Sequence, residues 1–283
     1  MRERSRRSRR AANHVVKALS LAAALLALGA LGWILYEVLA RGFSALNFSF
    51  FTDLPTPPGI AGGGLANAIV GTLLITFLAT MIGVPIGMLA GVYLGEFGLD
   101  SRSAHAIRFV CNLLMGTPSI IIGIFIYTLL VVPLGHFSGY AGAVALAIIM
   151  LPVVARTTED MLRLVPNALR EAALALGAPR WKVTLGVVFR AAQAGLITGV
   201  LLAVARISGE TAPLLFTALN SPYWIRSLRE PTANLTVTIF NYAMSPYADW
   251  KAKAWGASLL IMAAVLLLAV FSRLIFREKR GRA

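Results

Sequence analysis

The chain has few charged residues and almost no cysteine or histidine. Charged residues make up 13% of its 283 residues, whereas apolar residues make up 58%. Its one cysteine, Cys111, excludes an intrachain disulfide, and its three histidines lie far apart, so we expect no metal site. The chain has no Gly-x-x-x-x-Gly-Lys-Ser/Thr motif and no paired nucleophile and base. We therefore expect neither a nucleotide site nor a catalytic residue in it.

Long apolar runs dominate the rest of the sequence. Several uncharged runs reach the length of about 18 residues that marks a candidate membrane-spanning helix. A water-soluble core could not bury so many of them, so the predicted fold class is an all-α polytopic membrane protein. Residues 109–155 are too long for one crossing, and the polar, Gly-containing turn Gly135–Gly139 would divide them. We predict six transmembrane helices: at about 18–40, within 65–95, on either side of 135–139, around Arg206, and at about 254–275.

Basic residues lie mainly on one side of the predicted membrane domain. The net charge is +14, with six arginines in 2–10 and five basic residues in 273–282. If the N-terminus is cytoplasmic, twenty basic residues fall in cytoplasmic segments and five in outer loops. Basic segments stay on the cytoplasmic side, so we expect both termini in the cytoplasm and a basic tail at 1–17. A tail that binds RNA is the less favoured interpretation, and we expect no nucleic-acid partner.

Two opposite charges, Arg206 and Glu210, interrupt the apolar segment 191–223. A charge at the centre of a membrane helix costs roughly 2.5–3.5 kcal/mol on insertion scales, so it usually faces the protein interior and has a partner. Four residues apart on a helix, these side chains share a face and can pair. One interpretation is a structural ion pair. The other is a substrate path, in which Arg206 neutralises an anion and Glu210 holds or exchanges the arginine.

The longest cytoplasmic connection between spans, 166–190, has the pattern of a helical hairpin. Its first part favours helix, Gly177 supplies a C-terminal stop, and Pro179 suits the first turn of the next helix. The small Ala172, Ala173 and Gly177 leave room for another surface to approach closely. Both an ordinary hairpin and a docking site for a partner fit these residues.

This loop and several other segments resemble a known family. Glu171-Ala172-Ala173 followed by Gly177 resembles the EAA loop of binding-protein-dependent ABC importer permeases, which docks on a cytoplasmic ATPase. Other segments resemble the phosphate-specific, PstA-type members of that family, over about residues 50–276. These segments are Pro57-Pro58-Gly59, Gly62–Ala68, Pro118–Gly123, Pro152–Pro166 and Ala205–Leu219.

The resemblance implies a type I ABC importer permease for inorganic phosphate. Its transmembrane domain would span 67–275, with the EAA coupling loop at about 166–190. The implied substrate-path or coupling residues are Arg206, Glu210 and Arg156, although Arg156 could equally be an arginine that snorkels to the headgroups. The implied docking loop contains Glu171, Ala172, Ala173, Gly177 and Pro179.

The resemblance also implies partners in the inner membrane and on both sides of it. These are a second, PstC-like permease chain, a pair of PstB-like subunits that bind and use ATP, a PstS-like periplasmic phosphate-binding protein, and the lipid bilayer. The alternative is a stand-alone secondary carrier or channel for an anion, which would need no ATPase. Secondary carriers often contain internal inverted repeats, and we find no convincing repeat in this sequence.

Overall fold

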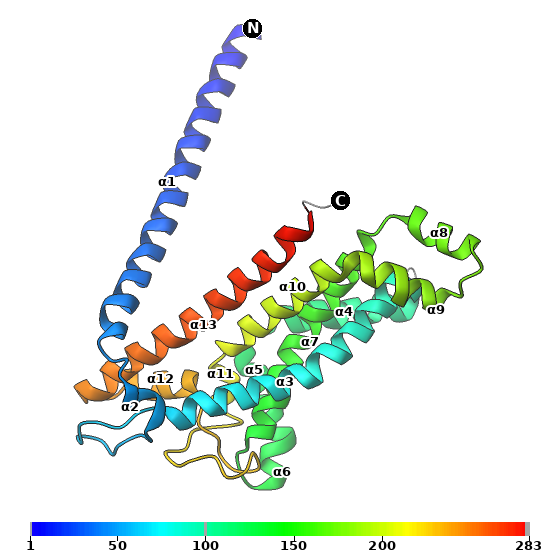
Figure 1. Ribbon diagram of the computed structural model, residues 1–283. Helices are drawn as coiled ribbons and strands as arrows, with labels where there is room; N and C mark the ends of the chain where they lie inside the picture. Colours follow the sequence, from blue (N-terminus) through cyan, green and yellow to red (C-terminus); the bar gives the residue numbers. More distant parts are fainter. Residues whose placement is uncertain (1, 99–100, 281–283) are drawn as a thin grey trace.

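The computed structural model describes residues 2–98 and 101–280, and every regular element in these residues is a helix (Figure 1). Five helices are long and apolar enough to cross a membrane: Arg9–Phe43, Ala66–Phe97, Gly139–Arg163, Arg180–Ser208 and Ala248–Phe271. A bent helix pair, Arg102–Gly116 with Ser119–Leu134, would be the sixth. The all-α polytopic prediction is confirmed.

The elements include three π-helical segments, η1 to η3, and the two longest connections between the elements are 53–65 and 216–234. Their bounds are α1 (Arg2–Phe43), α2 (Phe48–Thr52), α3 (Ala66–Val92), η1 (Tyr93–Phe97), α4 (Arg102–Gly116), α5 (Ser119–Ile126), η2 (Tyr127–Val131), α6 (Val132–Leu134), α7 (Gly139–Arg163), α8 (Asn167–Ala175), α9 (Arg180–Val183), η3 (Thr184–Val188), α10 (Phe189–Ser208), α11 (Ala212–Leu215), α12 (Leu235–Ala243) and α13 (Ala248–Arg280).

The first helix, α1, extends away from the other helices, and the C-terminal end of α1 meets α13 (Figure 1). At this crossing the Arg41 guanidinium lies 5.3 Å from the centre of the Trp255 ring. A Cβ on Gly42 would lie 2.7 Å from the Trp255 carbonyl oxygen, so the two backbones approach closely. The apolar side chains along the rest of α1 are exposed, which leaves them free to face lipid.

The centre of the core is the contact between α3 and α7. Glycines occur at every fourth residue along α3, at Gly83, Gly87 and Gly91. A Cβ at Gly87 or Gly91 would lie 2.9 or 2.5 Å from a carbonyl oxygen of α7, so only glycine allows this separation. Small residues at helix interfaces are how membrane helices gain close packing without a hydrophobic driving force.

The third predicted span is interrupted rather than continuous. The turn predicted at Gly135–Gly139 is present, since Gly135 has a φ of 74° and α7 begins at Gly139. A proline inside a membrane helix by default only kinks it, but at Pro118 the helix breaks. Helix α4 ends at Gly116 and α5 starts at Ser119, with a bend of 104° between them. The residue before a proline is pushed into extended conformation, and Thr117 has a ψ of 130°.

Candidate functional site

Arg206 and Glu210 line a cavity of about 230 Å³, and the residues at the break in the third span line it too. Arg206 lies in the last turn of α10. The other walls come from the end of α4, the start of α5 and one face of α7. The lining residues are Leu114, Met115, Thr117, Pro118, Ser119, Ile122, Ile149, Val153, Arg206 and Glu210. Two charges therefore face an otherwise mainly apolar cavity between helices.

The expected pairing of these two charges on one helical face is wrong. Helix α10 ends at Ser208, so Glu210 lies in the break before α11. Within residues 2–98 and 101–280, no ion pair joins Arg206 to Glu210. The backbone at this break is held by α12 instead. The Thr236 hydroxyl donates a hydrogen bond of 2.9 Å to the Glu210 carbonyl oxygen. Both charged side chains thus line the cavity without a contact between them.

The tight approach of α5 and α11 completes this region. A Cβ on Gly123 would lie 2.6 Å from the Pro213 Cα atom. Pro213 occupies the first turn of α11, where its missing N–H costs no helical hydrogen bond. Helix α5, whose start lines the cavity, is therefore packed against α11 through a glycine and a proline.

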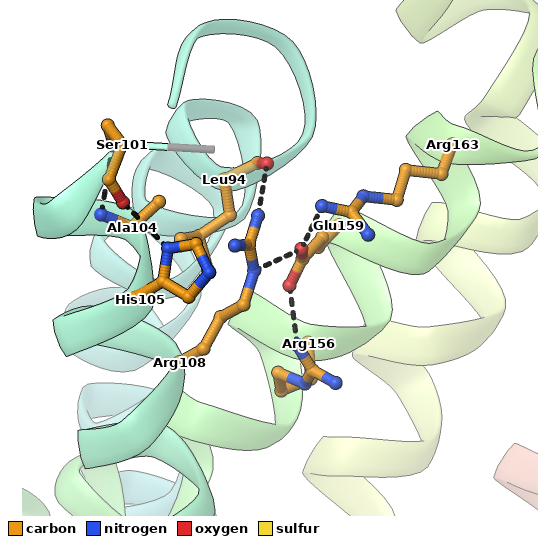
Figure 2. Close-up of polar contacts among 8 residues, drawn as sticks. All are labelled: Leu94, Ser101, Ala104, His105, Arg108, Arg156, Glu159 and Arg163. Atoms are coloured by element: carbon orange, nitrogen blue, oxygen red, sulfur yellow. Dashed lines mark hydrogen bonds and ion pairs between the residues drawn. The ribbon is translucent and has the colours of Figure 1, made fainter. Parts of the chain in front are cut away.

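A second group of charges surrounds Glu159 near the end of α7, and Figure 2 shows three arginines converging on its carboxylate. Arg156 Nη1 is 2.7 Å from Oε2, while Arg108 Nε and Arg163 Nη2 are each 2.8 Å from Oε1. The Glu159 side chain is completely buried, whereas those of Arg156 and Arg163 are 32% and 47% exposed. Arg108 also donates a hydrogen bond of 3.1 Å to the Leu94 carbonyl oxygen in η1. We call these four charged residues the Glu159 cluster.

The loop 166–190 has the predicted helix–turn–helix geometry. Helix α8 is followed by Gly177 with a φ of +80°, and Pro179 is the N-cap of α9. Glu171, Ala172, Gly177 and Pro179 are exposed, while Ala173 is half-buried and packs against the core of this end. Large apolar side chains lie beside them at the surface: Leu169, Leu174, Leu176 and Trp181. Exposed apolar patches of this kind are typical of surfaces that bind a partner.

Arg170 anchors this loop to the body of the protein. Its guanidinium makes two bonds to Glu96 in η1, with Nη2–Oε1 2.6 Å and Nε–Oε2 3.2 Å. It also donates to the carbonyl oxygens of Leu162 and Val165, at 2.7 and 2.5 Å. The pair is largely buried, with 18% of Arg170 and 8% of Glu96 exposed. A bidentate arginine pair of this kind fixes orientation as well as distance.

A larger cavity of about 680 Å³ lies between the connection before α3 and the connection before α12. Its walls include Pro55–Pro58 from the first segment and Ser221–Tyr223 from the second. Tyr242 and Trp250 also line it, and their rings stack at 4.3 Å. Burial, and then the nearby charge of Asp249, raises the pKa of Tyr242 to about 12, so this phenol stays neutral at physiological pH.

Comparison with known proteins identifies the family of this chain. Residues 83–280 match the family "Binding-protein-dependent transport system inner membrane component". The chain belongs to this family. The transport-system family contains membrane components, so the chain is a membrane subunit of a transporter and not itself an enzyme.

Relatives in this transport-system family cover nearly the whole chain. The phosphate transport system permease protein PstA of Yersinia pestis is 48% identical over 96% of this chain and 92% of its own length. The protein of the same name from Haemophilus influenzae is 49% identical over 96% of both chains. A probable PstA of Methanocaldococcus jannaschii is 41% identical over 75% of both chains.

Solved structures agree with the family at the level of the fold. The chain resembles a subunit of the MetNI methionine ABC transporter with a TM-score of 0.60 and 21% identity, over 76% of this chain and 94% of that chain. It resembles a chain of a bacterial alginate ABC transporter complex with a TM-score of 0.67 and 14% identity, over 93% and 94%. The type I ABC importer fold predicted from the sequence is thus confirmed.

Sequence reasoning found Arg156 but missed the other residues of the Glu159 cluster. Arg156, Glu159 and Arg163 have spacings of three and four, which place charged side chains on one helical face, so this part carried a local signal. Arg108 is 51 residues from Glu159 in the sequence, and no periodicity connects them. Arg156 does not line the cavity that Arg206 and Glu210 share; it lies three residues beyond Val153, which does.

Proposed function

We propose that the chain is a permease subunit of an ATP-driven importer for inorganic phosphate. The observation that carries this proposal is Arg206, a guanidinium facing a cavity between membrane helices in a chain nearly half identical to phosphate transport permeases. Arginine suits phosphate because its planar fork makes two parallel hydrogen bonds to phosphate oxygens. Glu210, in the same cavity, would compete for Arg206 when phosphate leaves. Arg156 lies on α7 about one turn beyond Val153, which lines the cavity. It would be the next positive charge on the path.

The docking loop supports the coupling to ATP hydrolysis on a separate subunit. Glu171, Ala172, Ala173, Gly177 and Pro179 form a turn between two helices at the surface, with apolar side chains around it. We expect this turn to enter a groove on a PstB-like ATPase pair. The transmembrane domain at about 67–275 would pair with a PstC-like permease chain, and a PstS-like protein would deliver phosphate from the periplasm.

The test is uptake of radioactive phosphate by phosphate-starved bacteria that lack their own copy of this permease. Expressing the chain with its own predicted partner subunits should restore uptake, and removing the ATPase subunit should abolish it. Uptake that continues without the ATPase would instead support a secondary carrier. Copurification of the complex and mass spectrometry of its chains would identify the partners directly.

Both termini and the basic tail at 1–17 should lie in the cytoplasm, because of the twenty-to-five distribution of basic residues. Single cysteines placed at the exposed positions Asn13 and Ile60, in a Cys111→Ser background, report on the two sides. An impermeant thiol reagent should label the cysteine at position 60 in intact cells and the one at position 13 only after lysis. The opposite pattern would overturn the orientation.

Replacing Arg170 with glutamine should loosen the docking loop. Removing one partner of a buried ion pair costs about 3–5 kcal/mol, and here two carbonyl contacts are lost as well. We expect amide hydrogen exchange in 167–178 to accelerate at least about tenfold and recovery of the ATPase with the permease to fall. Arg190→Gln is the matched control, because Arg190 is exposed and joins no ion pair within the described residues. Equal exchange rates in the two variants would contradict the anchoring role.

A further inference from the structure

The Glu159 cluster contains more positive charge than its one carboxylate balances. Three guanidinium groups lie within 2.8 Å of the two oxygens of Glu159, and the cluster carries two net positive charges. Glu159 is the shared acceptor: removing its charge would leave three arginines facing one another with nothing between them. A carboxylate that is fully buried persists only where its hydrogen-bonding capacity is met in this way.

The cluster lies on α4 and α7, the helices that line the cavity, and α7 leads into the docking loop. Arg108 belongs to α4, whose last turns supply Leu114 and Met115 to the cavity wall. Glu159 belongs to α7, whose preceding turns supply Ile149 and Val153 to the same wall. At its other end α7 finishes four residues before α8 begins. The carboxylate therefore joins the two helices that line the cavity, close to the point where the docking loop begins.

Glu159 also determines where Arg156 points. The hydrogen bond from Arg156 Nη1 to Glu159 Oε2 is 2.7 Å long and charge-assisted, and such bonds are roughly twice as strong as neutral ones. Val153 and Arg156 are three residues apart, so they lie on the same face of α7 as the cavity wall. Without this bond the long arginine side chain would be free to turn away from the path towards the headgroups.

We propose that Glu159 is a positioning residue for transport: its carboxylate holds Arg156 beside the substrate path and fixes α4 against α7. The assignment rests on the proposed function, in which Arg156 is part of that path. Arg108 and Arg163 serve as the other two fixed donors. The same carboxylate thus couples the shape of the cavity wall to the end of α7 that leads into the docking loop.

The test uses Glu159→Gln with Asp160→Asn as its matched control. Asp160 is the adjacent acidic residue, is exposed, and joins no ion pair in residues 2–98 and 101–280. In the assembled importer we expect Glu159→Gln to lower phosphate uptake about tenfold or more, as expected when a buried charge pair loses one partner. Asp160→Asn should leave uptake within about twofold of the unmodified protein, as surface changes usually do.

Cys111 supplies a readout that does not depend on transport. It is the only cysteine of the chain, is 2% exposed, and lies on α4 three residues after Arg108, on the same helical face. If Glu159 holds α4 against α7, Glu159→Gln should accelerate N-ethylmaleimide labelling of Cys111 about tenfold or more, because local opening exposes it. Labelling is measured on this chain by mass spectrometry of the intact complex, and Asp160→Asn should leave it unchanged.

Arg108→Gln provides a second variant should Glu159→Gln prevent assembly, since it cuts the contact to α4 but leaves Arg156 and Arg163 on the carboxylate. It should also accelerate Cys111 labelling and lower uptake. Loss of uptake with unchanged labelling in both variants, or faster labelling with normal uptake, would overturn the positioning role. Phosphate uptake by Arg206→Gln is measured in parallel, and normal uptake by that variant would contradict the proposed path. The labelling of Cys111 tests the Glu159 cluster independently of the path.

Discussion

Replacing Arg206 with glutamine is expected to lower phosphate uptake by about a hundredfold or more while leaving the importer assembled. Hydrogen bonds to charged groups contribute roughly 1.5–3 kcal/mol each, the guanidinium fork can make two of them, and about 1.4 kcal/mol corresponds to tenfold. The change should not unfold the protein, because the Arg206 side chain is exposed to the cavity and joins no ion pair within the described residues. Uptake of radioactive phosphate and the amount of purified complex measure the two effects.

Three further variants show which property of Arg206 the transport of phosphate requires. Arg206→Lys keeps the charge but loses the planar fork, so uptake should recover only in part. Arg226→Gln, at an exposed arginine between α11 and α12, is the control for lost positive charge and should import normally. The double variant Arg206→Gln, Glu210→Gln tests whether Arg206 serves only to balance the charge of Glu210 in their shared cavity, because function should then return when both charges are removed. Near-normal uptake in the double variant would contradict a role for Arg206 on the path.

The transmembrane helices were largely predictable because the bilayer itself sets their length and composition. A helix of about 20 apolar residues is required to cross, and five of the predicted spans occur as single helices in the structure. The third span was not predictable in detail. Pro118 in an apolar run fits both a kinked helix and a complete break, and the local sequence does not distinguish the two.

The candidate site was predictable only in its separate residues. Arg206 and Glu210 are conspicuous as charges in an apolar segment, but their relative position depends on where α10 ends, and that end falls between them. The cavity they face has walls from three stretches far apart in the sequence, 114–122, 149–153 and 206–210. The same holds for Arg108 with Glu159 and for Arg170 with Glu96, which are 51 and 74 residues apart. Such contacts depend on helix packing, which hydrophobic periodicity does not determine.

The docking loop was predictable in more detail, because its geometry comes from local chemistry. Glycine is the usual residue where a helix ends in left-handed conformation, and the positive φ of Gly177 follows from that rule. Pro179 precedes α9 as its N-cap. The apolar side chains around the turn, such as Leu176 and Trp181, are largely exposed.

The second large effect is therefore expected for Gly177→Val, which should abolish coupling to the ATPase while the permease stays in the membrane. A left-handed conformation costs an ordinary residue roughly 1–2 kcal/mol, and a β-branched residue is a genuine outlier there. We expect the turn between α8 and α9 to distort, the ATPase to be lost during purification, and phosphate uptake to fall to background. Membrane levels of the permease, ATPase recovery and uptake are the three measurements.

Two control variants separate the backbone effect from crowding at the interface. Gly186→Val adds the same side chain nearby, at an exposed glycine without a positive φ and with open space around its Cβ position, and should be tolerated. Gly177→Asn suits left-handed conformation, and a Cβ at 177 meets nothing within 4 Å in this chain. If Gly177→Asn restores coupling, the loop needs only its turn. If it fails like valine, the ATPase must approach the Cα atom itself, as the small residues Ala172 and Gly177 would allow. Normal ATPase recovery and uptake in Gly177→Val would contradict docking at this turn.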